Sequence, residues 1–167
     1  MTAPLARVIA TFGYVGHLRP ASGTWGSAAA IPVAWVLHMA GGPLLLGAAT
    51  LALFAAGLWA SAGFMRATGT HDPSEIVVDE AVGQWIALWP ISLGAAHAGA
   101  EVTALWPGIL AAFLLFRAFD IWKPGPIGWA DRQPGAMGVM LDDVLAGIAA
   151  AVCVMALAWV AHGLMGA

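Results

Sequence analysis

Two pairs of neighbouring carboxylates, Asp79-Glu80 and Asp142-Asp143, stand where long apolar runs begin, and a fifth acid, Asp120, stands where another run ends. Ionisable groups at the ends of membrane helices are costly unless they are paired, hydrated or bound to a metal, so they are candidates for function. Acids also stabilise helix N-termini through the helix dipole, which explains a single acid more readily than two pairs and a fifth. We therefore predict that these five acids form a metal-binding or catalytic site. Carboxylate ligands without clustered cysteines or histidines favour Mg²⁺ over Zn²⁺.

The run that ends at Asp120 also carries two basic residues with helical spacing. Arg117, Asp120 and Lys123 occupy positions i, i+3 and i+6, so a helix presents them on one face before Pro124 ends it. A guanidinium and an ammonium beside acids could bind a phosphate group. The alternative is that Lys123 and Trp122 only anchor the helix at the membrane interface. We expect Arg117 and Lys123 to bind phosphate.

A segment rich in glycine and hydroxyl groups, Ser22-Gly23-Thr24-Trp25-Gly26-Ser27, opens the first long apolar run. Free N–H groups and the positive end of the dipole at a helix N-terminus suit an anion. Serine and threonine also cap helices without binding any ligand. Because this segment is expected on the same membrane face as the acids, we predict that Thr24, Gly26 and Ser27 contact a substrate phosphate.

One histidine adjoins the acidic residues. His71 and Asp72 precede the Asp79-Glu80 pair, so His71 could orient a carboxylate or shuttle a proton. A solvated loop histidine is the alternative. We predict that His71 and Asp72 support the site.

The composition places these groups in a membrane protein. Of the 167 residues, 61% are hydrophobic and only 9% are charged, whereas soluble domains carry about 25% charged residues. The net charge of −3 and the absence of a basic run give no support for a nucleic-acid partner. Cys153 is the single cysteine, which excludes a disulfide or a thiolate metal cluster within this chain.

The chain contains five apolar runs, and their lengths are close to the roughly 20 residues that a membrane crossing needs. Gly41, Gly42 and Pro43 form a turn between the first two runs, and a Pro/Gly-rich loop, Pro124–Gly138, separates the last two. We expect an all-α polytopic membrane bundle of about five transmembrane or membrane-embedded helices, forming one domain over residues 1–167. The runs are Trp25–Ala40, Pro43–Phe64, Val82–Ala98, Thr103–Phe119 and Val144–Met165.

The positions of the basic residues predict the orientation. With a cytoplasmic N-terminus, all six face the cytoplasm, in agreement with the positive-inside rule. Eight of the nine acids fall on that same side, and only Glu101 falls opposite. We therefore expect the site at the cytoplasmic face. The six basic residues are Arg7, Arg19, Arg66, Arg117, Lys123 and Arg132.

Four ordered motifs resemble those of the phosphatidylglycerophosphatase A family. They span roughly residues 13–150. The motifs read Pro20-x-x-Gly23-Thr24-x-Gly26-Ser27, His71-Asp72-x-x-x-Ile-Val-x-Asp79-Glu80-x-x-Gly83-x-Trp85, Phe-Arg117-x-Phe-Asp120-x-x-Lys123-Pro124 and Met140-Leu-Asp142-Asp143-x-x-Ala-Gly147.

The resemblance implies Mg²⁺-dependent hydrolysis of phosphatidylglycerophosphate to phosphatidylglycerol and phosphate in a bacterial inner membrane. By the same resemblance, the two acidic pairs would be metal-binding or catalytic residues, and Arg117, Asp120 and Lys123 would complete the site. The nucleophile is either water or a carboxylate that forms an aspartyl-phosphate.

Three other functions fit the same sequence features. The first is a phosphatase for another lipid phosphomonoester, such as phosphatidic acid. The second is a small ion transporter, although transport sites are expected near the middle of the membrane rather than at helix ends. The third is an assembly subunit without activity.

Overall fold

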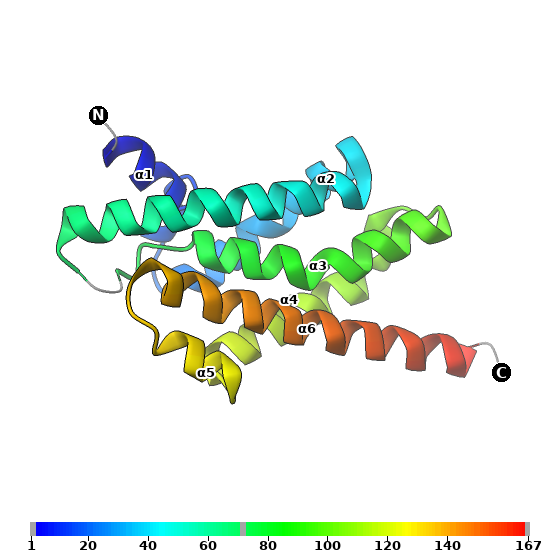
Figure 1. Ribbon diagram of the computed structural model, residues 1–167. Coiled ribbons are helices and arrows are strands. Elements are labelled where there is room, and N and C mark those ends of the chain that lie inside the picture. Colours follow the sequence, from blue (N-terminus) through cyan, green and yellow to red (C-terminus); the bar gives the residue numbers. More distant parts are fainter. Residues whose placement is uncertain (1–2, 71–72, 166–167) are drawn as a thin grey trace.

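The long apolar runs of the chain fold into helices, and the structure, a computed structural model, describes residues 3–70 and 73–165. No strand occurs within these two ranges. The order along the chain is α1 (Ala3–Ala10), the 3₁₀ turn η1 (Val15–His17), α2 (Ser22–Thr68), α3 (Val78–Ala98), the 3₁₀ turn η2 (Val102–Leu105), α4 (Trp106–Trp122), α5 (Pro126–Asp131) and α6 (Gly135–Met165). Figure 1 shows α3 lying between α2 and α6.

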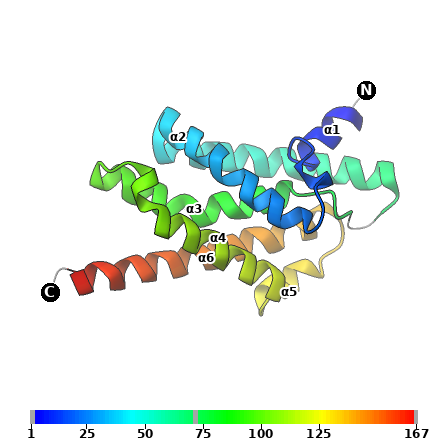
Figure 2. The same ribbon diagram turned by 180° about the vertical axis from the view of Figure 1, so that it is seen from behind.

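Three helical stretches are long and apolar enough to cross a membrane, namely α2, residues Val102–Trp122 and the part of α6 from Gly135 to Ala161. The 47-residue α2 is interrupted by non-helical backbone at Gly41 and Gly42, where the φ of Gly42 is +64°. Glycine adopts this left-handed conformation without the steric cost of a side chain. The chain reverses there (Figure 2), which confirms the turn predicted between the first two apolar runs.

Helix α3 is buried on several faces because α2, α4 and α6 all pack against it. Two indole N–H groups connect it to both arms of α2. Trp85 donates to the carbonyl oxygen of Ala30 at 2.9 Å, and Trp89 donates to the hydroxyl of Thr50 at 3.2 Å. These bonds satisfy polar groups within an apolar interior.

The segment predicted as the Pro124–Gly138 loop is partly helical, and that boundary prediction was wrong. Pro126 occupies the first turn of α5, where its missing N–H costs nothing. Helix α6 begins at Gly135 rather than near Val144. Asp142 and Asp143 therefore lie about two turns inside α6 instead of at its start.

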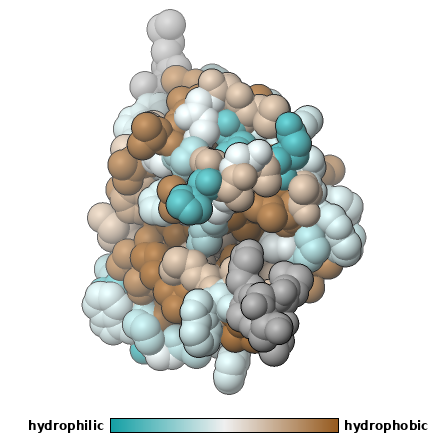
Figure 3. All heavy atoms as spheres, turned by 90° about the vertical axis from the view of Figure 1, so that its right-hand side faces the viewer, coloured by the Kyte–Doolittle hydropathy of each residue, from teal (hydrophilic) through white to brown (hydrophobic). Residues whose placement is uncertain are grey.

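The outside of the bundle is apolar, as expected for a surface in contact with lipid. Large hydrophobic side chains such as Leu44, Trp122 and Trp159 are more than three quarters exposed. Figure 3 views the end of the bundle away from the N-terminus of α3, where strongly hydrophilic residues cover only small areas. Exposed apolar surface on this scale is unfavourable in water, so the chain is a membrane helical bundle.

Candidate active site

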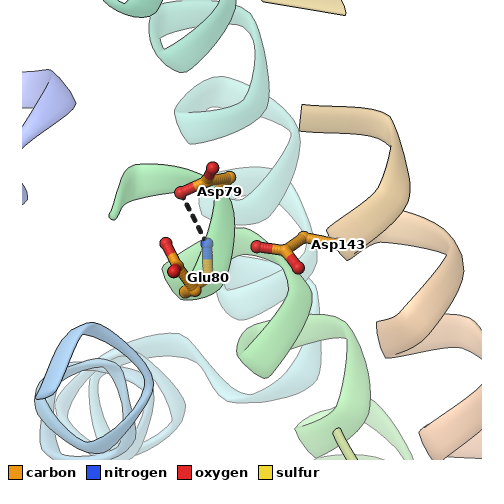
Figure 4. A group of neighbouring side chains, drawn as sticks. All are labelled: Asp79, Glu80 and Asp143. Atoms are coloured by element: carbon orange, nitrogen blue, oxygen red, sulfur yellow. Dashed lines mark hydrogen bonds between the residues drawn. The ribbon is translucent and has the colours of Figure 1, made fainter. Parts of the chain in front are cut away.

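Five acids from three helices converge at one end of the bundle. Asp79 and Glu80 lie in the first turn of α3, Asp120 lies near the end of α4, and Asp142 and Asp143 lie in α6. They form two overlapping groups, Asp79–Glu80–Asp143 and Asp120–Asp142–Asp143, and in each group three carboxylate oxygens lie within 4.8 Å of one another. Figure 4 shows the first group, with side chains from α3 and α6 side by side. Asp143 belongs to both groups.

Close helix packing brings these carboxylates together. Gly83 of α3 and Gly147 of α6 face each other, and a Cβ atom on Gly147 would stand 3.0 Å from the Cα of Gly83. Gly83 follows Asp79 by one helical turn, and Gly147 follows Asp143 by one turn. The two acids therefore come together one turn from the glycine contact, on its N-terminal side. Phe116 of α4, which is fully buried, closes the third side of Gly83.

The acids are poorly compensated inside the protein. Asp79, Asp142 and Asp143 are at most 7% exposed. One oxygen each of Glu80 (Oε2), Asp142 (Oδ1) and Asp143 (Oδ1) is buried without a hydrogen-bond partner among the described residues. Buried carboxylates that repel one another and lack donors are stabilised either by protonation or by a bound cation, and the two groups could hold such an ion. An all-oxygen ligand set fits a hard divalent cation such as Mg²⁺ better than Zn²⁺.

Lys123 lies at the edge of the acidic group and contacts two carboxylates. Its Nζ donates to Asp142 Oδ2 at 2.6 Å and also to Asp131. The residue ends α4 in a left-handed conformation with φ of +50°, which turns it away from the helical path. Burial alone would lower the pKa of the Lys123 ammonium, but its bonds to Asp131 and Asp142 outweigh burial and raise that pKa above the ordinary value.

Arg117 is held separately from Lys123. Its Nη1 forms an ion pair with Asp120 Oδ2 at 2.6 Å and donates to the Ser27 hydroxyl at 3.4 Å, while its Nε is buried without a partner in the described part of the chain. Arg117 and Asp120 thus pair at i and i+3 as the spacing indicated. Lys123 instead follows the left-handed turn toward α5 and α6.

The first turns of α2 lie beside the acids, but the Thr24 N–H and the Ser27 hydroxyl donate to the backbone of their own segment. The Ser27 hydroxyl donates to the carbonyl of Gly23 at 2.8 Å and is fully buried. Gly26 packs against Val77, where a Cβ would stand 2.8 Å from the Val77 Cβ. Thr24 lies in the first helical turn, with its N–H bonded to the carbonyl of Ala21.

A cavity of about 320 Å³ opens over the acids. From α2, Ser22 lines this cavity, whereas the predicted phosphate-binding residues Thr24, Gly26 and Ser27 do not. Of the two predicted phosphate-binding cations, Lys123 lines the cavity and Arg117 does not. His71 and Asp72, the predicted supporting residues, lie outside the described residues. The lining comprises Ser22, Pro73, Ser74, Ile76, Asp79, Glu80, Asp120, Lys123, Asp131, Gln133, Pro134, Gly135, Val139, Asp142 and Asp143.

Two further polar residues, one in the cavity lining and one inside α3, were given no role from the sequence. Asp131 was counted among the acids on this face but received no role, because its contact with Lys123 depends on how α5 folds. Gln84 is fully buried, and neither of its amide atoms has a partner among the described residues. Its position one turn after Glu80, inside an apolar run, was a signal available in the sequence.

The family model of phosphatidylglycerophosphatase A matches residues 8–158, which include all five converging acids. The chain belongs to the phosphatidylglycerophosphatase A family. A phosphatidylglycerophosphatase A of Escherichia coli is 36% identical over 141 residues, covering 83% of this chain and 76% of the relative. One of Haemophilus influenzae is 38% identical over 144 residues, covering 85% and 82%. No solved structure matches.

A third relative has a different name. A protein of Bacteroides thetaiotaomicron, provisionally named a phosphatidylinositol-3-phosphatase, is 39% identical over 114 residues, which cover 68% of this chain and 66% of the relative. Members of the phosphatidylglycerophosphatase A family are phosphatases, so this chain is an enzyme that hydrolyses a phosphomonoester. The ion-transporter and inactive-subunit alternatives are thereby rejected. The phosphatidylglycerophosphatase A match also confirms the resemblance seen in the four motifs.

Proposed function

We propose that this protein hydrolyses phosphatidylglycerophosphate to phosphatidylglycerol and phosphate, with Mg²⁺, at the cytoplasmic face of a bacterial inner membrane. The observation that carries the proposal is the convergence of five carboxylates and Lys123 around one cavity at an end of a membrane bundle. The names of the two relatives matched over most of their length support the substrate. A lipid keeps its acyl chains in the bilayer while its phosphate reaches such a cavity.

Mg²⁺ would be held by the two acidic pairs, Asp79-Glu80 and Asp142-Asp143, with Asp120 adjoining through the second group. When bound, the ion supplies Lewis-acid stabilisation of the charge on a phosphate and orients it. Lys123 contributes a fixed positive charge at the cavity wall, which offsets negative charge on the phosphate oxygens. Arg117 keeps Asp120 in place through its ion pair.

The reaction requires an oxygen nucleophile to attack phosphorus while the bond from phosphorus to the glycerol oxygen breaks. The glycerol oxygen leaves with a proton and becomes the free hydroxyl of phosphatidylglycerol. A carboxylate of the site can take a proton from attacking water and return one to the leaving oxygen. Alternatively, a carboxylate attacks directly, and water then hydrolyses the aspartyl-phosphate. Acid quenching during turnover distinguishes the two, since only the second route leaves labelled phosphate on the protein.

The phosphate-binding role of the α2 N-terminus is part of the same proposal. Thr24, Gly26 and Ser27 lie in the turns behind Ser22, and their segment adjoins both Glu80 and Arg117 through Gly23. The distribution of basic residues supports the cytoplasmic orientation. Accessibility of single cysteines placed at Arg66 and Glu101, in a variant lacking Cys153, tests that orientation in intact cells.

Phosphate release tests the function directly. Purified protein in detergent is given phosphatidylglycerophosphate or phosphatidic acid, each with Mg²⁺ or with a chelator. We expect release from phosphatidylglycerophosphate that is abolished by the chelator and by Asp143→Asn. Glu101→Gln is the matched control, because Glu101 is an exposed acid beyond the far end of α3. Equal or faster release from phosphatidic acid would contradict the substrate assignment, and full activity in chelator would contradict the metal.

A further inference from the structure

A second and larger cavity lies at the same end of the bundle, and the proposed chemistry does not use it. It has a volume of about 930 Å³ and lies between α1, the end of α2 and the segment of residues 73–75. That segment is a thin wall, because Pro73 and Ser74 line both this cavity and the acidic one. We call it the α1 groove. Its lining is Pro4, Arg7, Tyr14, His17, Phe64, Ala67, Thr68, Thr70, Pro73, Ser74 and Glu75.

In the part of the chain that the structure describes, the α1 groove differs in charge from the cavity over the acids, because it is lined by an arginine without a carboxylate partner. The guanidinium of Arg7 donates through Nη2 to Nε2 of His17 at 3.0 Å and has no carboxylate partner in the described part of the chain. The groove's one described acid, Glu75, is paired with Arg19 at 3.4 Å. Among the described residues, therefore, no carboxylate compensates the charge of Arg7, which favours an anion.

The wall between the two cavities is held in place by polar contacts. Ser22 donates its hydroxyl to the carbonyl of Ser74 at 2.6 Å, and Arg19 donates to the Ser74 hydroxyl at 3.2 Å. These bonds tie residues 73–75 to the start of α2. A ligand that reaches over Ser74 could place one anionic group on each side of the wall.

The proposed substrate has two such groups. Its terminal phosphomonoester and its internal phosphodiester are joined by a three-carbon glycerol bridge, and the diester leads on to the acyl chains. Phe64, Ala67 and Pro4 provide apolar surface next to Arg7, which suits the start of those chains.

We propose that the α1 groove binds the phosphodiester of the phospholipid, with Arg7 as its principal cation, while the phosphomonoester occupies the acidic cavity. This inference rests on the proposed function and names the group that gives it specificity. The planar guanidinium of Arg7 can donate two parallel hydrogen bonds to the oxygens of a phosphate group. Phosphatidic acid has no internal phosphodiester, so the groove adds nothing to its binding affinity.

Product and phosphate inhibition test the two cavities separately. Phosphatidylglycerol carries only the diester, and inorganic phosphate occupies only the acidic cavity. Each is titrated as an inhibitor of phosphomonoester hydrolysis in detergent micelles, with diacylglycerol as a lipid that has chains but no phosphate. The variants are Arg7→Gln, Arg7→Lys and the matched control Arg66→Gln, which removes an exposed arginine at the same end but outside the groove lining.

We expect Arg7→Gln to weaken inhibition by phosphatidylglycerol about tenfold, since a charge-assisted hydrogen bond to phosphate is lost. Inhibition by inorganic phosphate stays unchanged, Arg7→Lys recovers part of the loss, and Arg66→Gln behaves as the parent. Equal phosphatidylglycerol inhibition of parent and Arg7→Gln, or no inhibition of the parent, overturns the groove assignment. Failure of the proposed function looks different, because the parent would then release no phosphate from phosphatidylglycerophosphate.

Discussion

Gly147 of α6 lies directly against the backbone of Gly83 in α3, so that a Cβ on Gly147 would stand 3.0 Å from the Gly83 Cα and closer still to its carbonyl oxygen. Neither helix has a side chain that could move aside at this point. The spacing of the two helices is therefore set by backbone contact. Because Asp79 and Asp143 lie one turn away, the same contact sets the spacing of the carboxylates.

Gly147→Ala should separate α3 and α6 and disturb the metal-binding group. Overpacking of a close contact costs about 1–3 kcal/mol, so we expect a lower melting temperature and at least tenfold less phosphate release. Gly94→Ala is the matched control, because Gly94 is in α3 and a Cβ there meets nothing within 4 Å. Comparable activity of the two variants would show that the spacing of these helices does not govern the site.

Asp143→Asn should reveal that the acids repel one another without a cation. Asp143 is 3% exposed and belongs to both carboxylate groups. Removing its charge relieves repulsion, so in Mg²⁺-free buffer the variant should be more stable than the parent by roughly 1 kcal/mol. Melting curves with and without Mg²⁺ should show stabilisation of the parent, about 2.7 kcal/mol at a hundredfold excess over Kd, and little for the variant. A variant that Mg²⁺ stabilises as much as the parent contradicts this ligand assignment.

The helices were largely predictable because hydrophobic runs and glycine punctuation are local signals. The Gly41–Gly42 break in α2 and the end of α4 at Lys123, before Pro124, both follow from backbone preferences. The start of α6 was misplaced because Gly135 and Gly138 suggest a loop. Gly138 lies within α6, where its missing side chain lets the backbone of Gln133 approach closely. This contact cannot be predicted from the local sequence pattern.

The convergence of the acids was predictable from topology, whereas their partners were not. The apolar runs place the start of α3, the end of α4 and the N-terminal part of α6 at one face, which brings Asp79, Asp120 and Asp143 together. The helical spacing of Arg117 and Lys123 suggested one shared face, but Lys123 has φ of +50° and turns to Asp131. Such a departure depends on where α5 packs.

Asp131 should affect substrate binding by holding Lys123 in position. Asp131→Asn removes one of the two carboxylates that hold the ammonium, so we expect KM to rise several-fold with a smaller change in kcat. Lys123→Met should lower kcat/KM further, because the charge itself is lost. The pKa of Lys123 is raised above 10.5, so the ammonium stays charged, and its contribution to stability present, throughout the neutral range. Arg132→Gln is the control, and an equal KM effect there would remove the special role of Asp131.

Gly23→Ala should separate activity from stability. Gly23 lies in the first turn of α2, and a Cβ there would meet the Glu80 carboxylate, with Cδ at 3.1 Å, and Arg117 Nη1 at 3.2 Å. Both neighbours are ends of flexible side chains, so they can shift at small cost in folding free energy. The shift changes the position of Glu80 relative to Asp79 and Asp143, and misplacing one member of a proposed catalytic group by a fraction of an ångström costs activity.

We therefore expect Gly23→Ala to keep its melting temperature within a few degrees of the parent but to release phosphate at least tenfold more slowly, equivalent to about 1.4 kcal/mol in the activation barrier. Its apparent affinity for Mg²⁺, measured by the concentration that restores activity after chelation, should fall in parallel. Gly47→Ala makes the same change in α2 where a Cβ meets nothing within 4 Å, and it should retain both properties. If Gly23→Ala lost stability and activity together, the close approach of α2 would serve helix packing rather than placement of Glu80.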